Sequence, residues 1–227
     1  MKTIGIIGAG HIGQAIAGQL LKNNIPVLLS NSRDTETLGP IISKLGKGVK
    51  AATTSEAAAA DIIILALPWW EVNKLTDVTD WTGKLVIDIT NEFLPGGKIA
   101  DLGDKTSTGI VLEQIPGARI VKAFNTLFAA RIAADPVIGD GRRVVFVAGD
   151  DLQAKSEVID LIKSINFAPV DLGTLEIGSK FIEAKGVFPG CIWPNYKYNS
   201  VCTNDGKQGD SCFKSCLLLY RVDPMCQ

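Results

Sequence analysis

Short apolar runs alternate along the chain with stretches in which apolar and polar residues repeat at helical spacing. The runs predict strands at residues 3–7, 26–29, 49–52, 62–67, 85–89, 120–124, 144–148 and 168–171. Several are apolar throughout, as strands buried on both faces must be. The stretches between them predict helices at residues 12–23, 35–45, 55–60, 71–78 and 152–165. This alternation predicts an α/β fold with a doubly wound, mostly parallel sheet.

Several predicted helix boundaries carry capping residues. Thr53 and Glu56 fit the reciprocal capping box at the start of the third helix. Gly46 follows the second helix, where a glycine commonly ends a helix. Asp150 and Asp151 precede the last helix as candidate caps. These capping residues support the helix assignments in addition to the apolar periodicity.

The last part of the chain has a different composition. From about residue 186 the periodicities disappear, and Cys, Asn, Tyr, Gly and Asp become frequent. A chain of 227 residues has room for one sizeable domain with an appendage. We therefore expect one folded domain over residues 1–185 and an atypical tail over residues 186–227, disordered or poorly packed. All five cysteines lie in this tail: Cys191, Cys202, Cys212, Cys216 and Cys226.

The five cysteines allow two kinds of cross-link. Disulfides within the chain would leave one cysteine unpaired. Cys212 and Cys216 are spaced for a zinc site with Cys191 and Cys202, but the other spacings are wide and the tail holds no histidine. The sequence therefore predicts no metal site.

The charges of the chain are balanced, with 23 Lys and Arg against 24 Asp and Glu and a net charge of −1. No positive excess is present to hold a nucleic acid or an anionic membrane surface. The longest apolar run, residues 62–70, has about half of the ~20 residues that a helix needs to cross a bilayer. We therefore expect neither a nucleic-acid partner nor a membrane span.

The compartment is indicated by the cysteines and by the start of the chain. Lys2 precedes an apolar stretch, as in a signal peptide, but three glycines, His11 and Gln14 interrupt that stretch. The first 190 residues carry no cysteine, which is typical of the cytosol, whereas a cysteine-dense tail is typical of secretion. We expect a cytoplasmic protein.

A glycine-rich motif stands between the first predicted strand and the first predicted helix. It matches G-x-G-x-x-G with the residues Gly8, Ala9, Gly10, His11, Ile12 and Gly13. In this position the first glycine allows a tight turn, the second lets a pyrophosphate approach the backbone, and the third allows close packing of helix on sheet. The helix N-terminus adds unpaired N–H groups that favour an anion. The motif predicts a Rossmann-type dinucleotide-binding domain.

The turn after the second strand indicates which dinucleotide binds. NAD sites carry a carboxylate there for the ribose 2′-hydroxyl, and this chain has Asn31, Ser32 and Arg33 instead. These residues can donate to a 2′-phosphate, at about 1.5–3 kcal/mol for each charged hydrogen bond. Two such bonds predict a preference of roughly a hundredfold for NADP(H) over NAD(H). Asp34 follows at once and would weaken the positive field.

Four further segments carry a resemblance to a known family. They are Leu-Ala-Leu-Pro-Trp at 65–69, Asp-Ile-Thr-Asn at 88–91, Pro-Gly-Ala-Arg-Ile-Val-Lys-Ala-Phe-Asn-Thr at 116–126, and Val-Ala-Gly-Asp-Asp at 147–151. With the motifs above, in this order and over residues 1 to about 178, the chain resembles the NADP oxidoreductases that use the deazaflavin coenzyme F420. Related NADPH-dependent flavin or ferric reductase domains are similar. The Val-Lys-Ala-Phe-Asn-Thr segment is the most specific part.

The resemblance implies where the redox chemistry takes place. The nicotinamide side of the cleft would be lined by Leu67, Pro68 and Trp69. The opposite wall, where a flavin or deazaflavin co-substrate stacks, would be formed by Asn91, Ala123, Phe124 and Asn125. Hydride passes directly between the two rings, so catalysis needs positioning rather than a general acid or base. We nominate no catalytic residue.

Other residues in these segments have structural interpretations. Asn125 is equally suited to cap the turn after its strand. Trp70 has a weaker case than Trp69 for lining the cleft. Lys122 alternates with apolar neighbours, and we expect its charged end to extend from the strand to solvent. His11, the only histidine, lies in the phosphate-binding turn and receives no catalytic role.

We expect an NADP(H)-dependent oxidoreductase that transfers hydride between NADPH and a flavin or deazaflavin acceptor. A small imine or ketone reductase of the pyrroline-carboxylate reductase type is an alternative, but such enzymes add a large helical domain, and residues 179–227 show no helical pattern. A non-catalytic NADPH sensor is a second alternative.

Two departures from the family pattern qualify these expectations. Residues 35–37 lack the further basic residue that often follows the Ser-Arg pair, which favours a modest affinity for the 2′-phosphate. Residues 188–227 do not align with the family's closing segment, which completes the substrate side. The apolar composition and this missing cover are compatible with a homodimer.

Overall fold

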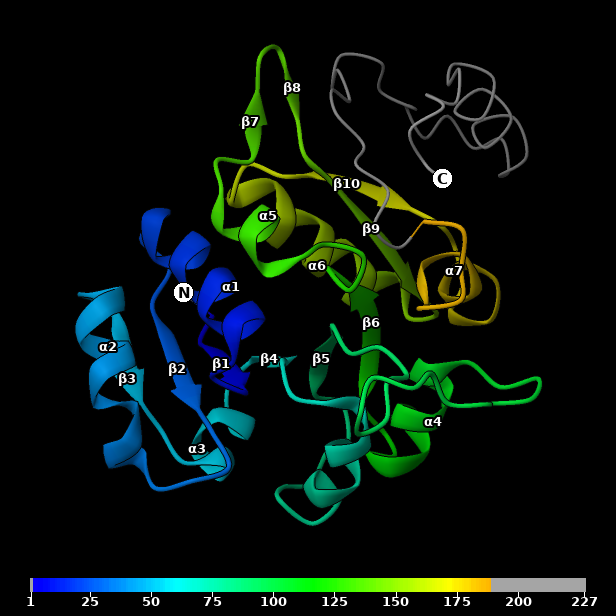
Figure 1. Ribbon diagram of the computed structural model, residues 1–227, viewed down its shortest axis with the longest axis horizontal. Helices are drawn as coiled ribbons and strands as arrows, with labels where there is room; N and C mark the ends of the chain where they lie inside the picture. Colours follow the sequence, from blue (N-terminus) through cyan, green and yellow to red (C-terminus); the bar gives the residue numbers. More distant parts are fainter. Residues whose placement is uncertain (1, 189–227) are drawn as a thin grey trace.

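The computed structural model describes residues 2–188, in which helices pack on both faces of a central sheet (Figure 1). Residues 189–227, including all five cysteines and nearly all of the predicted tail, lie outside the described residues. The predictions made for the tail and its cysteines concern that part of the chain and stay predictions.

Eight strands form the main sheet, and each agrees with a predicted strand. They are β1 (Ile4–Ile7), β2 (Val27–Ser30), β3 (Val49–Ala51), β4 (Ile62–Leu65), β5 (Leu85–Asp88), β6 (Arg119–Ala123), β9 (Val144–Gly149) and β10 (Ala168–Asp171). Their order across the sheet is β10-β9-β6-β5-β4-β1-β2-β3. The polypeptide reverses its winding between β3 and β4, so β1 and β4 are neighbours at the centre. The predicted doubly wound fold is confirmed.

The sheet is parallel from β3 to β6 and changes direction at β9. In the antiparallel pair β6–β9, Val121 lies opposite Gly149, and β10 runs parallel to β9. The connection from β6 to β9 contains a small hairpin of β7 (Val137–Ile138) and β8 (Gly141–Arg142). An antiparallel neighbour needs no crossover helix over the sheet, and a local apolar run cannot reveal this change of direction.

The predicted helices are present, and three more were not predicted. The helical segments are α1 (His11–Lys22), η1 (Thr35–Leu38), α2 (Gly39–Leu45), α3 (Thr54–Ala58), η2 (Trp69–Leu75), α4 (Ser107–Gln114), α5 (Ala129–Ala133), α6 (Leu152–Ser164) and α7 (Leu175–Ile182). The second predicted helix divides at Gly39 into a 3₁₀ turn and an α-helix with Pro40 in its first turn. The unpredicted α4, α5 and α7 are short, and α4 and α7 contain a glycine.

The predicted capping residues have the expected partners, with one exception. The Thr53 hydroxyl and the Glu56 carboxylate complete the capping box of α3. Gly46 ends α2 with a φ of 86°. Asp151 caps α6 by accepting from the backbone N–H of Ala154. Asp150 instead accepts from the N–H of Leu175 at the start of α7, at 2.9 Å, so it holds a different helix from the one predicted.

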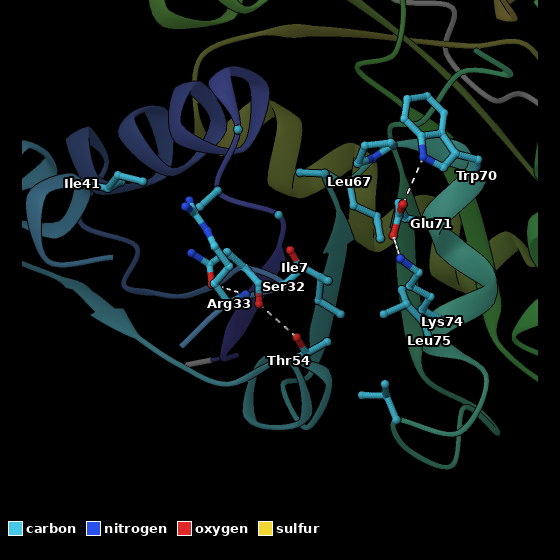
Figure 2. Close-up of a pocket in the computed structure, with 17 residues that line it drawn as sticks. Ile7, Ser32, Arg33, Ile41, Thr54, Leu67, Trp70, Glu71, Lys74 and Leu75 are labelled. Atoms are coloured by element: carbon cyan, nitrogen blue, oxygen red, sulfur yellow. Dashed lines mark hydrogen bonds and ion pairs between the residues drawn. The ribbon is translucent and has the colours of Figure 1, made fainter. Parts of the chain in front are cut away.

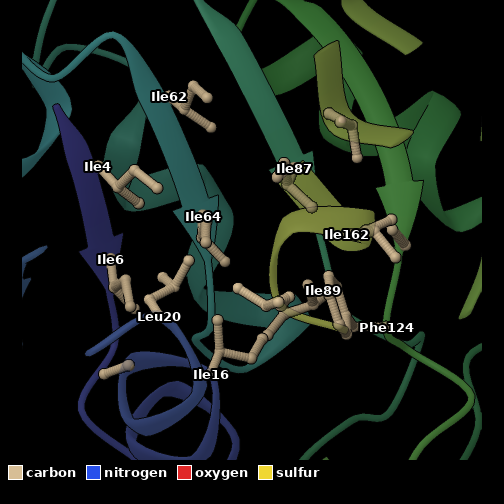
Figure 3. Close-up of a cluster of buried hydrophobic side chains, with 14 of the residues drawn as sticks. Ile4, Ile6, Ile16, Leu20, Ile62, Ile64, Ile87, Ile89, Phe124 and Ile162 are labelled. Atoms are coloured by element: carbon tan, nitrogen blue, oxygen red, sulfur yellow. The ribbon is translucent and has the colours of Figure 1, made fainter. Parts of the chain in front are cut away.

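The side chains of the central strands alternate between two hydrophobic layers. Ile62 and Ile64 of β4 pack with α1 and α6 on one face, which Figure 3 shows around Ile16, Leu20 and Ile162. Ile63 and Leu65 face the other layer, which holds the apolar residues of α3, η2 and α4. Burial on both faces explains the continuous apolar runs of the sequence. Among the described residues, none of the helices combines the length and the hydrophobicity that a membrane crossing requires.

Candidate dinucleotide site

The glycine motif forms the turn from β1 to α1. Gly8 has a φ of 117°, and a Cβ atom there would lie 2.1 Å from the carbonyl oxygen of Ala66. A Cβ atom on Gly13 would lie 2.0 Å from the carbonyl oxygen of Gly8. A Cβ atom on Gly10 would meet nothing within 4 Å. Gly8 and Gly13 are therefore needed for close packing, whereas the space beside Gly10 is open.

This open space lies at the N-terminus of α1, where Gly10 is the N-cap residue and no side chain of the described residues caps the helix. The first backbone N–H groups of a helix lack partners within it and attract anions. The cradle therefore fits a diphosphate. His11, the first residue of α1, is exposed, while Ile12 is half-buried and Gly13 is buried.

A cleft of about 810 Å³ extends from this turn across the carboxyl ends of β1, β2 and β4. Its lining includes Gly8, Ala9 and Gly10 of the glycine turn, all three residues of the turn after β2, and Leu67 and Pro68 after β4. These sequence-predicted residues are thus brought together in one cavity. Ligands of open parallel sheets bind at this edge.

The turn after β2 carries the positive charge of the cleft. The Asn31 side-chain oxygen accepts from the N–H of Arg33 at 2.9 Å, and its amide donates to the Thr37 hydroxyl at 2.9 Å. Asn31 therefore shapes the turn, while the side chains of Ser32 and Arg33 are exposed. Arg33 forms no ion pair within the described residues, so neither Asp34 nor Glu36 occupies its guanidinium there.

A smaller hollow of about 540 Å³ adjoins the turn and is lined by residues 31–36 with Thr53 and Thr54. Thr54, at the start of α3, lines both cavities, and its hydroxyl donates to the carbonyl oxygen of Asn31 at 3.4 Å. Thr54 was not predicted as a site residue. The sequence could have indicated Thr54, because it follows β3 closely and so lies at the same edge of the sheet as the other site residues.

The wall opposite Arg33 comes from η2, as Figure 2 shows. Trp70, Glu71 and Lys74 line this wall, and Glu71 accepts from Lys74 and from the Trp70 indole N–H. The hydrogen bond from Lys74 is the main cause of a lowered pKa of Glu71. Its carboxylate is therefore ionised at neutral pH and keeps Lys74 paired.

The tryptophan that lines the cleft is not the one that we expected. Trp70 lines the cleft, whereas Trp69 is half-buried, packs in the second hydrophobic layer and donates its indole N–H to the carbonyl oxygen of Ser107 at 3.1 Å. Trp69 therefore does not line this cleft. Leu67 and Pro68, which were predicted with Trp69 for the nicotinamide side, do line the cleft.

The predicted second wall, at the carboxyl ends of β5 and β6, lies outside the cleft. Asn91 and Asn125 are joined by two hydrogen bonds: the Asn91 amide donates to the Asn125 carbonyl oxygen at 2.9 Å, and the Asn125 amide donates to Asn91 Oδ1 at 3.0 Å. The Asn125 amide also donates to the carbonyl oxygen of Ile182 in α7. These asparagines fix the two strand ends and α7 together.

Ala123 and Phe124 are core residues. Ala123 is fully buried and Phe124 is 2% exposed, with its ring edge-on to Phe167 at 5.9 Å. Their side chains therefore do not form an open wall, contrary to the expectation from the resemblance. Phe124 has a φ of 62°, a conformation that is uncommon for a bulky residue. The strained backbone lies next to Asn125, at the end of β6.

The expectation that Lys122 reaches solvent is wrong. Lys122 is fully buried, and its Nζ lies 3.1 Å from Asp88 Oδ2, 3.0 Å from the Thr90 carbonyl oxygen and 3.2 Å from the Ser107 hydroxyl. The other oxygen of Asp88 accepts from the N–H and the hydroxyl of Thr90. These partners satisfy the three donors of the ammonium, as a buried charge requires.

The comparison with known proteins agrees with this geometry. Residues 3–92 match the family model "NADP oxidoreductase coenzyme F420-dependent". The crystal structure of a hypothetical protein, SMa0349 from Sinorhizobium meliloti, is 42% identical and has a TM-score of 0.81, with 85% of this chain and 95% of that chain covered. A candidate F420-dependent NADP reductase from Arthrobacter sp. FB24 is 26% identical with a TM-score of 0.66, covering 77% and 86% of the two chains.

A curated relative is the rat (Rattus norvegicus) metalloreductase STEAP3, which is 27% identical over 197 residues, 86% of this chain. The chain spans 38% of the length of that protein, little more than a third. Residues 3–92, which span β1 to β5, are therefore similar to the coenzyme F420-dependent NADP oxidoreductases, and the similarity to solved structures extends over most of the described chain.

Proposed function

We propose that this protein is an oxidoreductase that transfers hydride between NADPH and a flavin or deazaflavin acceptor. The observation that carries the proposal is the cleft that joins an open glycine turn to an exposed Arg33, which forms no ion pair within residues 2–188. The family supplies the same expectation for the cofactor.

Each part of NADP(H) can be matched to residues that line the cleft. The N–H groups around Gly10 would bind the diphosphate, and Ser32 and Arg33 would donate to the 2′-phosphate. Leu67 and Pro68, after β4, would border the nicotinamide, which supplies a hydride from its C4 carbon when bound. Apolar contacts there orient the ring and exclude water, so no side chain needs to transfer a proton.

An aromatic acceptor is favoured by the exposed apolar residues near this edge. Trp70, Phe93 and Phe128 follow β4, β5 and β6, and are 36%, 40% and 69% exposed. The carboxyl ends of these parallel strands lie at the same edge of the sheet. Flat rings of a flavin or deazaflavin match such surfaces better than a small polar imine does. We keep the cytoplasm as the proposed compartment, because the cysteine-free body suits it.

The test is an acceptor panel with purified full-length protein. NADPH is mixed with F420, FMN, FAD, riboflavin, ferric chelates or pyrroline carboxylate, and its absorbance is followed. The proposal predicts NADPH oxidation that depends on a flavin or on F420. Oxidation with ferric chelates alone would favour a metal reductase, and oxidation with pyrroline carboxylate alone would favour the imine reductase. Binding of NADPH without turnover by any acceptor would favour a sensor.

Arg33→Ala is the matched variant for this assay, with Arg131→Ala as its control, because Arg131 lies on α5 outside the cleft. The proposal predicts a raised KM for NADPH in Arg33→Ala and an unchanged KM in the control. Equal values in both variants would contradict the assignment of the 2′-phosphate position.

A further inference from the structure

A separate cavity, of about 240 Å³, shares no residue with the dinucleotide cleft. It lies between the loop that follows Asn91 and the C-terminal end of α7. Glu92 and residues 100–105 form one side, and Lys180, Glu183, Lys185 and Gly186 form the other. Neither the family motifs nor the proposed hydride transfer accounts for this cavity.

Glu92 is the unusual member of its lining. The residue is 2% exposed, and its side-chain Oε2 is buried without a hydrogen-bond partner among the described residues. Its backbone is well held, because the Glu92 carbonyl oxygen accepts from the N–H of Ala100 at 2.8 Å. A buried carboxylate oxygen without a donor is costly and rare in folded proteins. This oxygen therefore indicates a donor that the described chain does not supply.

The neighbouring Glu183 differs, because its partners are present. Its Oε1 accepts from the N–H of Ser107 at 2.6 Å and from the Ser107 hydroxyl at 2.9 Å. Glu183 thus holds the start of α4 in place. Glu92 is therefore the carboxylate of this pair that lacks a hydrogen-bond donor within the described residues.

The charges around the cavity favour a positive occupant. Four carboxylates line it, those of Glu92, Glu183, Asp101 and Asp104. Among the lining lysines, Lys105 is paired with Glu113, which leaves Lys180 and Lys185 to oppose the four. Within residues 2–188 no group of three or more His, Cys, Asp or Glu side chains is arranged to hold a metal ion. An organic cation with N–H donors fits both the charge and the free acceptor.

We propose that this cavity binds a small organic cation, a primary ammonium or a guanidinium, and that Glu92 accepts hydrogen bonds from its N–H groups. The volume admits a head group with a short carbon chain. The occupant would lie one residue from Asn91, whose amide holds the end of β6 through Asn125. The proposal does not depend on the proposed hydride transfer.

The test is calorimetric titration of the full chain with n-propylammonium and agmatine, with tetramethylammonium as a probe that has the charge but no N–H donor. We expect saturable binding of the first two in the millimolar range or tighter, and binding of tetramethylammonium at least tenfold weaker. Glu92→Gln should weaken the binding of agmatine at least tenfold. Glu176→Gln, an exposed carboxylate of α7 outside the cavity, should leave it unchanged.

A second variant should change the affinity for agmatine in the opposite direction, and its result does not depend on whether the buried variant Glu92→Gln folds. Lys185→Glu places a further negative charge at the cavity and should strengthen the binding of agmatine several-fold. The proposal is overturned if neither amine saturates wild-type protein by 50 mM, if tetramethylammonium binds equally well, if Glu92→Gln folds and binds like wild type, or if Lys185→Glu weakens binding.

Discussion

Gly10 and Gly13 differ in what a side chain at each position would contact. Alanine at Gly10 has free space, since its Cβ would meet nothing within 4 Å, whereas alanine at Gly13 would press on the Gly8 carbonyl oxygen. We therefore expect Gly10→Ala to leave the free energy of unfolding within about 0.5 kcal/mol of wild type, while it weakens NADP(H) binding at least tenfold by filling the diphosphate cradle. Urea unfolding and calorimetry measure the two quantities.

Gly13→Ala is the paired variant, and it should lower the free energy of unfolding by about 1–3 kcal/mol through overpacking. The contrast between the two glycines distinguishes a binding turn from a purely structural one. Unchanged NADP(H) affinity in a folded Gly10→Ala protein would contradict the placement of the diphosphate.

The turn after β2 allows a test of cofactor choice. Arg33→Ala removes the free guanidinium, and Asn31→Asp keeps an acceptor for the Arg33 N–H while adding a charge that repels a phosphate. Each variant should weaken NADP(H) binding by roughly tenfold to a hundredfold and change NAD(H) binding much less. Fluorescence titration with both nucleotides checks this. A parallel loss of both nucleotides would indicate a collapsed turn instead.

Residue roles could be predicted from the sequence where the chemistry is local. The Thr53–Glu56 box and the Asp151 cap depend on residues three apart, so both were predicted correctly. Lys122 was misjudged because its partners, Asp88 and Ser107, are distant in the sequence. Trp70 rather than Trp69 lines the cleft, and the indole of Trp69 is instead hydrogen-bonded to Ser107, a partner distant in the sequence.

At the scale of elements, the buried ion pair joins β5, β6 and the start of α4. Lys122→Met would leave the Asp88 carboxylate buried without its cation, which costs about 3–5 kcal/mol in comparable cases. We expect a loss of that size in the free energy of unfolding, measured by urea denaturation. Lys50→Met on β3 is the control, because Lys50 is an exposed strand lysine. A loss below 1 kcal/mol for Lys122→Met would contradict the role given to the pair.

The cap of α6 predicts a dependence of stability on pH. The hydrogen bond from Arg119, followed by that from the Ala154 N–H, lowers the pKa of Asp151 from 3.8 to about 2. Because the folded-state pKa lies below the unfolded one, this contribution to stability is present above about pH 4 and is lost as the pH falls through 2.

Asp151→Asn should therefore reduce the fall in stability between pH 4 and pH 2, as followed by thermal unfolding in acid. Asp77→Asn, at an exposed position, should leave the wild-type slope. An identical slope in Asp151→Asn and wild type would show that the Arg119–Asp151 pair does not survive in solution.

Strands were predicted better than helices because a buried strand is a continuous apolar run, whereas short helices depend on their neighbours. α7 contains Gly178, and a Cβ atom there would lie 2.7 Å from the Cβ atom of Ala148 in β9. This glycine weakens the helical pattern in the sequence but is required for close packing on the sheet. The antiparallel direction of β9 has no local signal at all.

For the whole molecule, the fold could be predicted from the alternation of apolar runs with helical stretches, and the dinucleotide cleft from motifs at the ends of the first strands. The acceptor side could not be predicted in this way. The residues that the resemblance assigns to that side do not form an open wall: Asn91 and Asn125 join strand ends, and Ala123 and Phe124 belong to the core. The homodimer also stays a prediction, for which sedimentation velocity is the direct test.

One cleft is expected to hold the diphosphate at Gly10 and the 2′-phosphate at Arg33. Calorimetric titration of the wild-type chain with NADPH and with NADH measures this most directly. We expect one site for NADPH per chain and an affinity for NADH that is weaker by roughly a hundredfold. Equal affinities for the two nucleotides, or no heat from either at saturating concentration, would contradict this expectation.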